Sequence, residues 1–182
     1  MQVSIRSDNE VRVKRLIRAM PKQAGKAMAR TLTKVAKSGK SNSAKMIRET
    51  FTAKAAGIKK AITTTRAKPQ RLVAYIKVKS KRLSLVHFGA KDKDPEGVVV
   101  EVRKKGKKIR IPSAFIAKAS GSGANRVFVR VGKKRLKIRS LVGPSVTSMF
   151  KGTDRRLTAF LKQRLPKVFY QELAHERRKM RR

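Results

Sequence analysis

Residues 109–150 read IRIPSAFIAKASGSGANRVFVRVGKKRLKIRSLVGPSVTSMF, and this stretch decides the fold. In residues 126–131 valine alternates with arginine or phenylalanine, which is the period of two of a half-buried strand. The chain then turns at 132–134 and offers a second short strand at Leu136–Ile138. Gly143-Pro144 ends this strand, and a helix begins at Ser145. We predict a β-arm that presents the loop Leu141–Ser145 to a partner.

The residues before this arm also have strand character. The segments 72–78 and 83–88 are apolar and β-branched, and a polar loop follows at 91–97. Residues 98–103 and 109–111 predict a hairpin whose turn, 104–108, contains Gly106. Because Pro112 limits further pairing, Ala114–Ala117 is either an edge strand or a bend followed by one.

Helical periodicity dominates both ends of the chain. After an extended lead at 1–7, Asp8 or Asn9 caps a first helix whose apolar face is Val13, Leu16, Ile17 and Met20. One long amphipathic helix is expected from Lys22 to Thr50, in spite of the poor helix sequence 38–43. A shorter helix lies within 51–68 and ends in a threonine-rich exit at 63–65.

After Ser145 the apolar spacing is helical again, with breaks or kinks expected at Gly152 and Pro166. The order of elements predicts an α+β fold, in which a long basic N-terminal helix and C-terminal helices pack on a small antiparallel sheet or partial barrel. We expect one domain over residues 1–182. Its parts are a helical part at 1–68, a β part at 69–142, a helical part at 143–176 and a basic tail at 177–182 that need not be ordered.

The charge of the chain is extreme. Fifty lysines and arginines against ten acidic residues give a net charge of +40 in 182 residues, which a compact chain tolerates best beside a polyanion. The sequence has no cysteine, which excludes disulfides and thiolate zinc sites and suits a reducing cytoplasm. It has no apolar run long enough for a transmembrane helix and no signal-peptide core, so no membrane partner is expected.

Two groups of cations are candidates for contact with DNA. Residues 11–48 hold twelve lysines and arginines and no acid, and residues 103–151 hold fifteen and no acid. In the first group a helix aligns the cations in a stripe that can follow a phosphate backbone. In the second they gather at hairpin tips, where edge protection is an equally good explanation. The candidate DNA-facing residues are Lys22, Lys26, Arg30, Lys34, Lys37, Lys104, Lys105, Lys107, Lys108, Lys133, Lys134 and Arg135.

The residues needed for catalysis or for a metal site do not gather in the sequence. His87 and His175 are isolated, and Asp92, Asp94 and Glu96 lack the ligand count and glycine of a calcium loop. No aromatic residues are interleaved with the cations for base stacking, so contact with the phosphate backbone without base reading is favoured. We therefore expect no enzyme activity, no cofactor and no metal.

The stretches Pro112–Ile116, Arg126–Val131 and Leu141–Phe150, with the long basic helix before them and RLPK in a C-terminal helix, resemble the prophage minor tail protein Z family. This resemblance implies a tail completion protein of lambda-like long-tailed phages. It implies a virion component in the tail or neck, assembled in the host cytoplasm, that joins the tail to the DNA-filled head. Expected partners are the tail terminator, head–tail joining proteins and packaged double-stranded DNA bound without sequence specificity.

The same resemblance implies a homo-oligomeric ring, for which six-fold symmetry is expected. Residues expected to form or position the protein-binding loops are Pro112, Phe115, Leu141, Gly143, Pro144, Ser145 and Met149. Composition alone favours an alternative, a sequence-nonspecific nucleic-acid-binding protein of ribosomal or nucleoid type. A third possibility, an integrase- or nuclease-like enzyme, requires a carboxylate cluster that the sequence does not offer.

Overall fold

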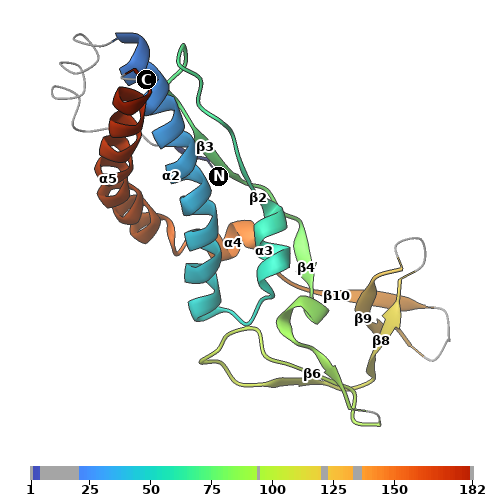
Figure 1. The fold of residues 1–182 in the computed structure, drawn as a ribbon. Coiled ribbons are helices and arrows are strands. Elements are labelled where there is room, and N and C mark those ends of the chain that lie inside the picture. Colours follow the sequence, from blue (N-terminus) through green and yellow to red (C-terminus); the bar gives the residue numbers. More distant parts are fainter. Residues whose placement is uncertain (1, 5–20, 94, 120–122, 133–136, 181–182) are drawn as a thin grey trace. The chain divides into compact units, whose positions relative to one another are not determined.

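The computed structural model describes residues 2–4, 21–93, 95–119, 123–132 and 137–180 (Figure 1). The chain divides into two compact units, each assembled from separate segments. Unit 1 contains the residues up to Ser43, the segment Ile62–Val78 and the residues from Gly152 onward, and unit 2 contains Ala44–Ala61 and Lys79–Lys151. Long helices and small antiparallel sheets occur together, so the predicted α+β class is confirmed. The expected single domain stays a prediction.

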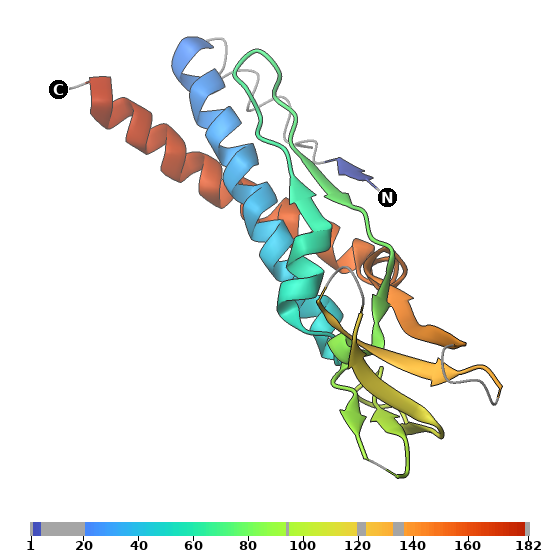
Figure 2. The same ribbon diagram turned by 90° about the vertical axis from the view of Figure 1, so that its right-hand side faces the viewer.

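Unit 1 is organised around helix α2 (Pro21–Thr50), most of which belongs to it. Helix α5 (Asp154–Met180) lies along one side of α2, and the hairpin of β2 (Ile62–Thr64) and β3 (Tyr75–Val78) lies along another (Figures 1 and 2). Strand β1 (Gln2–Ser4) completes a sheet in the order β1-β3-β2, all antiparallel. The buried apolar face of α2 packs between these elements and provides much of the core of the unit.

Gly39 lies in the poor helix sequence 38–43, through which α2 continues without a break. A Cβ atom on Gly39 would lie 2.6 Å from Ile76 Cδ1 and 2.9 Å from Leu161 Cδ2. A glycine at this position therefore lets a strand and a second helix both approach the backbone of α2. The buried Ser43 hydroxyl donates to the Gly39 carbonyl at 2.7 Å, which leaves no polar atom unpaired at this contact. The prediction of one long helix is confirmed.

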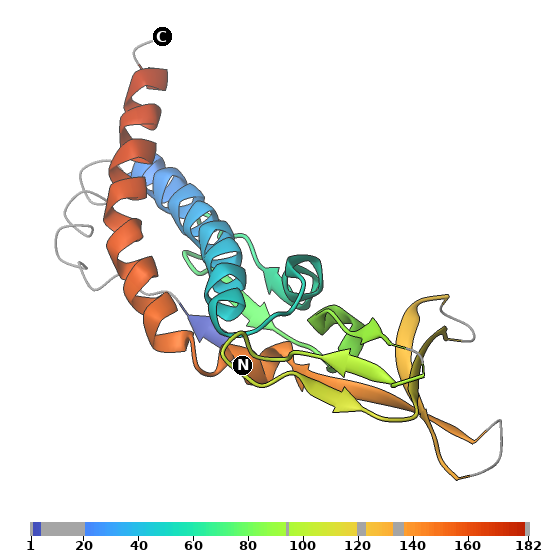
Figure 3. The ribbon, with the colours of Figure 1, turned by 90° about the horizontal axis from the view of Figure 1, so that it is seen from below.

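Unit 2 contains two further antiparallel sheets (Figure 3). One has the order β4-β10-β9-β8, with β4 at Arg82–Ser84, β10 at Ile138–Ser145, β9 at Asn125–Arg130 and β8 at Ala114–Lys118. The other has the order β5-β6-β7, with β5 at Lys91–Asp92, β6 at Val98–Val100 and β7 at Ile109–Ile111. The remaining elements are helices α3 (Ala55–Ala61) and α4 (Val146–Phe150) and the 3₁₀ helix η1 (Leu85–Phe88).

The β-arm predicted from residues 109–150 forms as a sheet. Strands β9 and β10 pair with Val127 opposite Leu141, and β8 pairs with β9 with Phe115 opposite Phe128. Strand β8 is an edge strand of its sheet, which was one of the two alternatives for Ala114–Ala117. The predicted hairpin of 98–103 and 109–111 is also present as β6 and β7.

Four local predictions about unit 2 and the hairpin of unit 1 are wrong. Leu141–Ser145 is the second half of strand β10 and not a loop; Pro144 is accommodated because the pairing with β4 is irregular between Val142 and Ser145. Residues 85–88 form a 3₁₀ helix, which buries Leu85 and Phe88 together. Residues 63–64 form part of strand β2, and the expected polar loop at 91–97 begins with strand β5.

The C-terminal helices agree with the sequence in their start and in the break at Gly152. Ser145 caps α4, as its Oγ accepts a hydrogen bond from the Ser148 N–H at 3.1 Å. Gly152 separates α4 from α5, as expected. Pro166 lies inside α5, so the helix does not break there, and a kink at Pro166 stays a prediction. Arg177–Lys179 form the last turn of α5 and not a separate tail. The expected first helix at Val13–Met20 lies outside the described residues.

Candidate nucleic-acid and protein interfaces

The exposed face of α2 carries a row of cations. Lys26, Arg30, Lys34 and Lys37, all in unit 1, are exposed. At 1.5 Å per residue the row is about 17 Å long, and it can follow neighbouring phosphates of one strand. These residues include four of the five candidates on this helix; the side chain of Lys22 lies outside the described residues. Their contact with DNA stays a prediction.

Two of these cations are paired within unit 1. Arg30 Nη1 bonds Glu176 Oε1, and Lys34 Nζ bonds Glu172 Oε1, both on α5. The two glutamate side chains are nearly buried, at 9% and 7% exposure, whereas Arg30 and Lys34 are 43% and 62% exposed. The pairs thus hold α5 against α2 and neutralise the middle of the row.

The spacing of these four charged residues in the sequence already indicates the two ion pairs, which the sequence analysis did not predict. Arg30 and Lys34 are four residues apart on one helix, and Glu172 and Glu176 are four apart on the other. Residues four apart lie on the same helical face, so the two helices can pair at both positions when they run side by side. The pairing leaves Lys26 and Lys37 as candidates without an ion pair among the described residues.

Further cations lie next to the N-terminal half of α2. The Thr33 hydroxyl accepts a hydrogen bond from the Ala67 N–H at 3.1 Å, which fixes the connection between β2 and β3 beside α2. This connection exposes Arg66, Lys68 and Arg71. The pair of Arg30 with Glu176 brings the last turn of α5 to the same region, and that turn exposes Arg177, Arg178 and Lys179. The basic surface of unit 1 therefore comes from three elements and not from α2 alone.

The second predicted group of cations is only partly described. Lys104, Lys105, Lys107 and Lys108 are all exposed in the connection between β6 and β7, where the Gly106 N–H closes a turn on the Arg103 carbonyl at 2.9 Å. The Lys104 N–H donates to the Thr50 carbonyl at 3.0 Å, so the base of this connection is held to the end of α2. Lys133, Lys134 and Arg135 lie outside the described residues.

One face of the β10-β9-β8 sheet carries apolar side chains next to cations. Phe115 lies directly opposite Phe128, and Ile138 lies opposite Arg130. Because side chains alternate along a strand, Val142 and Arg126 share this face with them. The larger apolar side chains of the face are Phe115, Phe128, Ile138 and Val142. The two phenylalanine rings are 6.0 Å apart, and the Arg130 guanidinium lies 5.7 Å from the centre of the Phe115 ring. Ile138 and Val142 are each 45% exposed. We call these four residues the apolar sheet face; only Phe115 was a candidate from the sequence.

Several predicted interface residues have packing roles in unit 2. A Cβ on Gly143 would lie 2.6 Å from Phe88 Cε2, and Met149 is 3% exposed. Ser145 caps α4, and Leu141 lies on the opposite side of its sheet from the apolar sheet face, beside the buried Val127.

Pro112 is exposed just before Ser113, whose φ of 57° makes the turn into β8. Phe115 and Pro144 are half-buried. Among the seven predicted contact residues, all of them described, Pro112 is therefore the exposed one, and their contact with a partner stays a prediction.

The described residues contain no group of three His, Cys, Asp or Glu side chains that could hold a metal ion. Within the same residues, no helix is long and apolar enough to cross a membrane.

A family model described as prophage minor tail protein Z (GPZ) matches residues 10–182. The sequence matches no curated protein, and it matches no solved structure.

Proposed function

This chain belongs to the prophage minor tail protein Z family, a family of phage tail structural proteins, and from that premise we propose that it completes the tail at its junction with the DNA-filled head. In this role it binds neighbouring neck and tail proteins and contacts the packaged DNA without reading its sequence. A homo-oligomeric ring that follows the symmetry of the tail belongs to the same proposal and rests on the family alone.

The row of cations on α2 is the observation that carries the DNA part of the proposal. Lys26 and Lys37 are exposed on one helical face, and the described part of the chain pairs neither with an acid. Contact with phosphates requires only cations at suitable spacing, since phosphate oxygens carry no sequence information. A conduit that must pass DNA of any sequence needs this kind of contact.

The apolar sheet face supports the protein-binding part. Four apolar side chains share one side of a sheet, and two of them are 45% exposed, which is typical of a surface that a partner covers. Arg130, held over Phe115, adds a cation of the type enriched in protein interfaces. This face belongs to unit 2, whereas the α2 residues Lys26 and Lys37 belong to unit 1, so the two contacts use different residues.

The proposal is tested by charge reversal in a phage that depends on this chain. Lys26→Glu with Lys37→Glu is the informative variant, because replacing Arg30 would also break its pair with Glu176. Lys59→Glu with Lys60→Glu, on the exposed side of α3, changes the net charge by the same amount. We expect the α2 variant to enter tails but to give far fewer infectious, DNA-retaining particles than the α3 variant. Equal yields for the two variants would exclude DNA contact by this face.

The nucleoid-type alternative predicts a different behaviour. It requires a stable free protein whose affinity for duplex DNA falls steeply with salt, whether or not tails are present. The tail proposal requires instead that the protein co-purifies with assembled tails. Recovery only in the soluble, nucleic-acid-bound fraction of infected cells would favour the alternative.

A further inference from the structure

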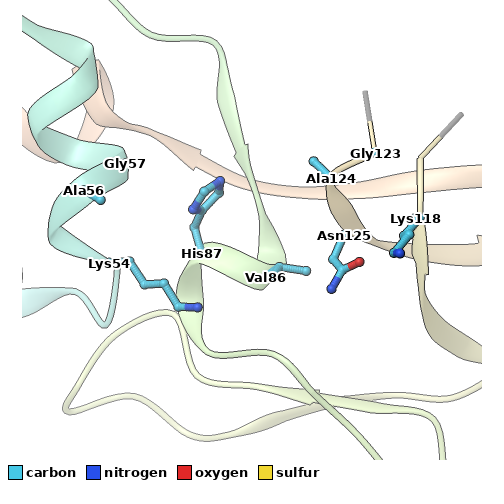
Figure 4. Close-up of a pocket in the computed structure, with 9 residues that line it drawn as sticks. All are labelled: Lys54, Ala56, Gly57, Val86, His87, Lys118, Gly123, Ala124 and Asn125. Carbon is cyan, nitrogen blue, oxygen red and sulfur yellow. The ribbon is translucent and has the colours of Figure 1, made fainter. Parts of the chain in front are cut away.

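Unit 2 contains an open groove of about 470 Å³ that neither the basic row nor the apolar sheet face includes. One wall is formed by α3 and η1, with Lys54 and His87, and the other by the end of the β8–β9 hairpin, with Lys118 and Asn125 (Figure 4). Val86 and Asn125 point toward one another across it (Figure 4). A volume of this size is typical of sites for small molecules or for a few residues of a peptide.

The groove has walls that are fixed by backbone contacts. The Lys54 N–H donates to the His87 carbonyl at 2.9 Å, and the His87 ring packs beside the backbone of α3 at Gly57, where a Cβ would lie 3.4 Å from His87 Nδ1. On the other wall, Lys118 and Asn125 are directly opposite each other in the β8–β9 pairing. The polar groups that line the groove are therefore presented from a defined backbone.

The groove combines cationic and donor groups with a small apolar lining. Lys54 and Lys118 are exposed and form no ion pair with a described acidic residue, and the Asn125 amide is both a donor and an acceptor. The apolar lining consists of small residues such as Ala56, Val86 and Ala124. Such a lining accepts methylene groups, whereas the lysines and the amide recognise a carboxylate.

We propose that this groove binds a short acidic segment of a neighbouring tail protein, seating its Asp or Glu side chains between Lys54 and Lys118. The inference rests on the proposed tail function for the identity of the partner. The carboxylates would receive charge-assisted hydrogen bonds from the two lysines, and Asn125 would hold the backbone of the segment. Fully exposed lysines alone would attract any polyanion, and the apolar lining adds the preference for a carboxylate side chain over a bare phosphate.

A second copy of this chain is a poor occupant. The chain has only ten acidic residues against fifty lysines and arginines, and four of the described acids already have partners. Glu172 and Glu176 pair with α2, Asp92 accepts a hydrogen bond from the Ile116 N–H at 3.1 Å, and Glu96 lies 3.5 Å from Arg110. Duplex DNA presents its phosphates on a convex surface, which meets the rim of such a groove better than its interior.

The test measures binding of a fluorescent, end-capped oligoglutamate peptide to the full chain by anisotropy, at about 0.15 M salt to suppress nonspecific attraction. Lys54→Ala with Lys118→Ala removes the two groove cations. The matched control is Lys104→Ala with Lys105→Ala, which removes two exposed cations from the connection between β6 and β7. Asn125→Leu perturbs the groove without a change of charge, and a short DNA duplex serves as the second probe.

We expect the groove double variant to weaken peptide binding about 10-fold or more and the control double variant to change it less than about 2-fold. Asn125→Leu should weaken peptide binding and leave duplex binding unchanged. Equal losses in the two double variants would show that only net charge matters and would overturn the proposal. Unchanged peptide binding by the groove double variant would also overturn the proposal. The same holds if that variant loses affinity for the duplex but not for the peptide. Tail assembly is not measured, so failure here is distinguishable from failure of the tail role.

Discussion

Gly143→Ala is the sharpest test of how unit 2 is packed. Gly143 lies in β10 against the ring of Phe88, which is 1% exposed in the core. A methyl group at this position would lie 2.6 Å from Phe88 Cε2, 3.1 Å from Cδ2 and 3.2 Å from Cζ. Carbon atoms in contact prefer about 3.5–4.0 Å, so the ring or the strand must move by about 1 Å.

The cost follows from the rigidity of the surroundings of Phe88. Overpacking of a well-packed core usually lowers the free energy of unfolding by about 1–3 kcal/mol. For a chain of this size each kcal/mol corresponds to about 2–4 °C in the unfolding midpoint, so we expect a decrease of about 2–12 °C. Gly152→Ala is the control, because a Cβ on Gly152 would have no atom within 4 Å.

The assay is thermal unfolding followed by circular dichroism, completed by a double-mutant cycle with Phe88→Leu. A smaller side chain at position 88 relieves the contact, so Gly143→Ala should cost less in that background, with a coupling of about 0.5–3 kcal/mol. An unchanged midpoint for Gly143→Ala would refute the packing role. A stable Gly143→Ala protein that fails to enter tails would restore the interface role predicted from the sequence.

Two further predictions concern the ion pairs and the apolar sheet face. Arg30→Ala leaves the buried carboxylate of Glu176 without its cation and should lower the free energy of unfolding by about 1–3 kcal/mol, measured in urea titrations. Lys37→Ala, an exposed change on the same helical face, should change it by less than about 0.5 kcal/mol. Equal effects of the two variants would contradict a stabilising role of the ion pair between Arg30 and Glu176. Ile138→Asp with Val142→Asp should leave the unfolding midpoint nearly unchanged, since both side chains are 45% exposed. The double variant should sharply reduce recovery of the protein in purified tails. Normal recovery would exclude the apolar sheet face as the docking surface.

Periodicity predicted the elements well where one physical signal dominated. The amphipathic pattern of residues 22–50 predicted α2, and the valine alternation of 126–131 predicted β9. It failed where tertiary contacts decided the conformation. The sequence of residues 85–88 is typical of a strand, but these residues form a 3₁₀ helix that buries Leu85 and Phe88. Gly143-Pro144 is typical of the end of a strand, but β10 continues through it because its pairing with β4 is irregular there.

The candidate surfaces could be predicted only in part, because they too depend on tertiary contacts. Cations on one helical face can be counted in the sequence, and Lys26 and Lys37 are exposed as expected. That Arg30 is bound to a glutamate 146 residues away depends on how α5 packs on α2. Likewise, the apolar sheet face requires the register of three strands, which places Ile138 and Val142 with Phe115 although they are far apart in the sequence.

Contact between α2 and packaged DNA can be measured inside assembled particles. DNA-filled particles are crosslinked with formaldehyde, digested with nuclease and protease, and searched by mass spectrometry for nucleotide adducts on lysine. We expect adducts on Lys26 and Lys37 and none on Lys59 and Lys60 of α3. Adducts absent from α2, or equally frequent on both helices, would exclude this contact.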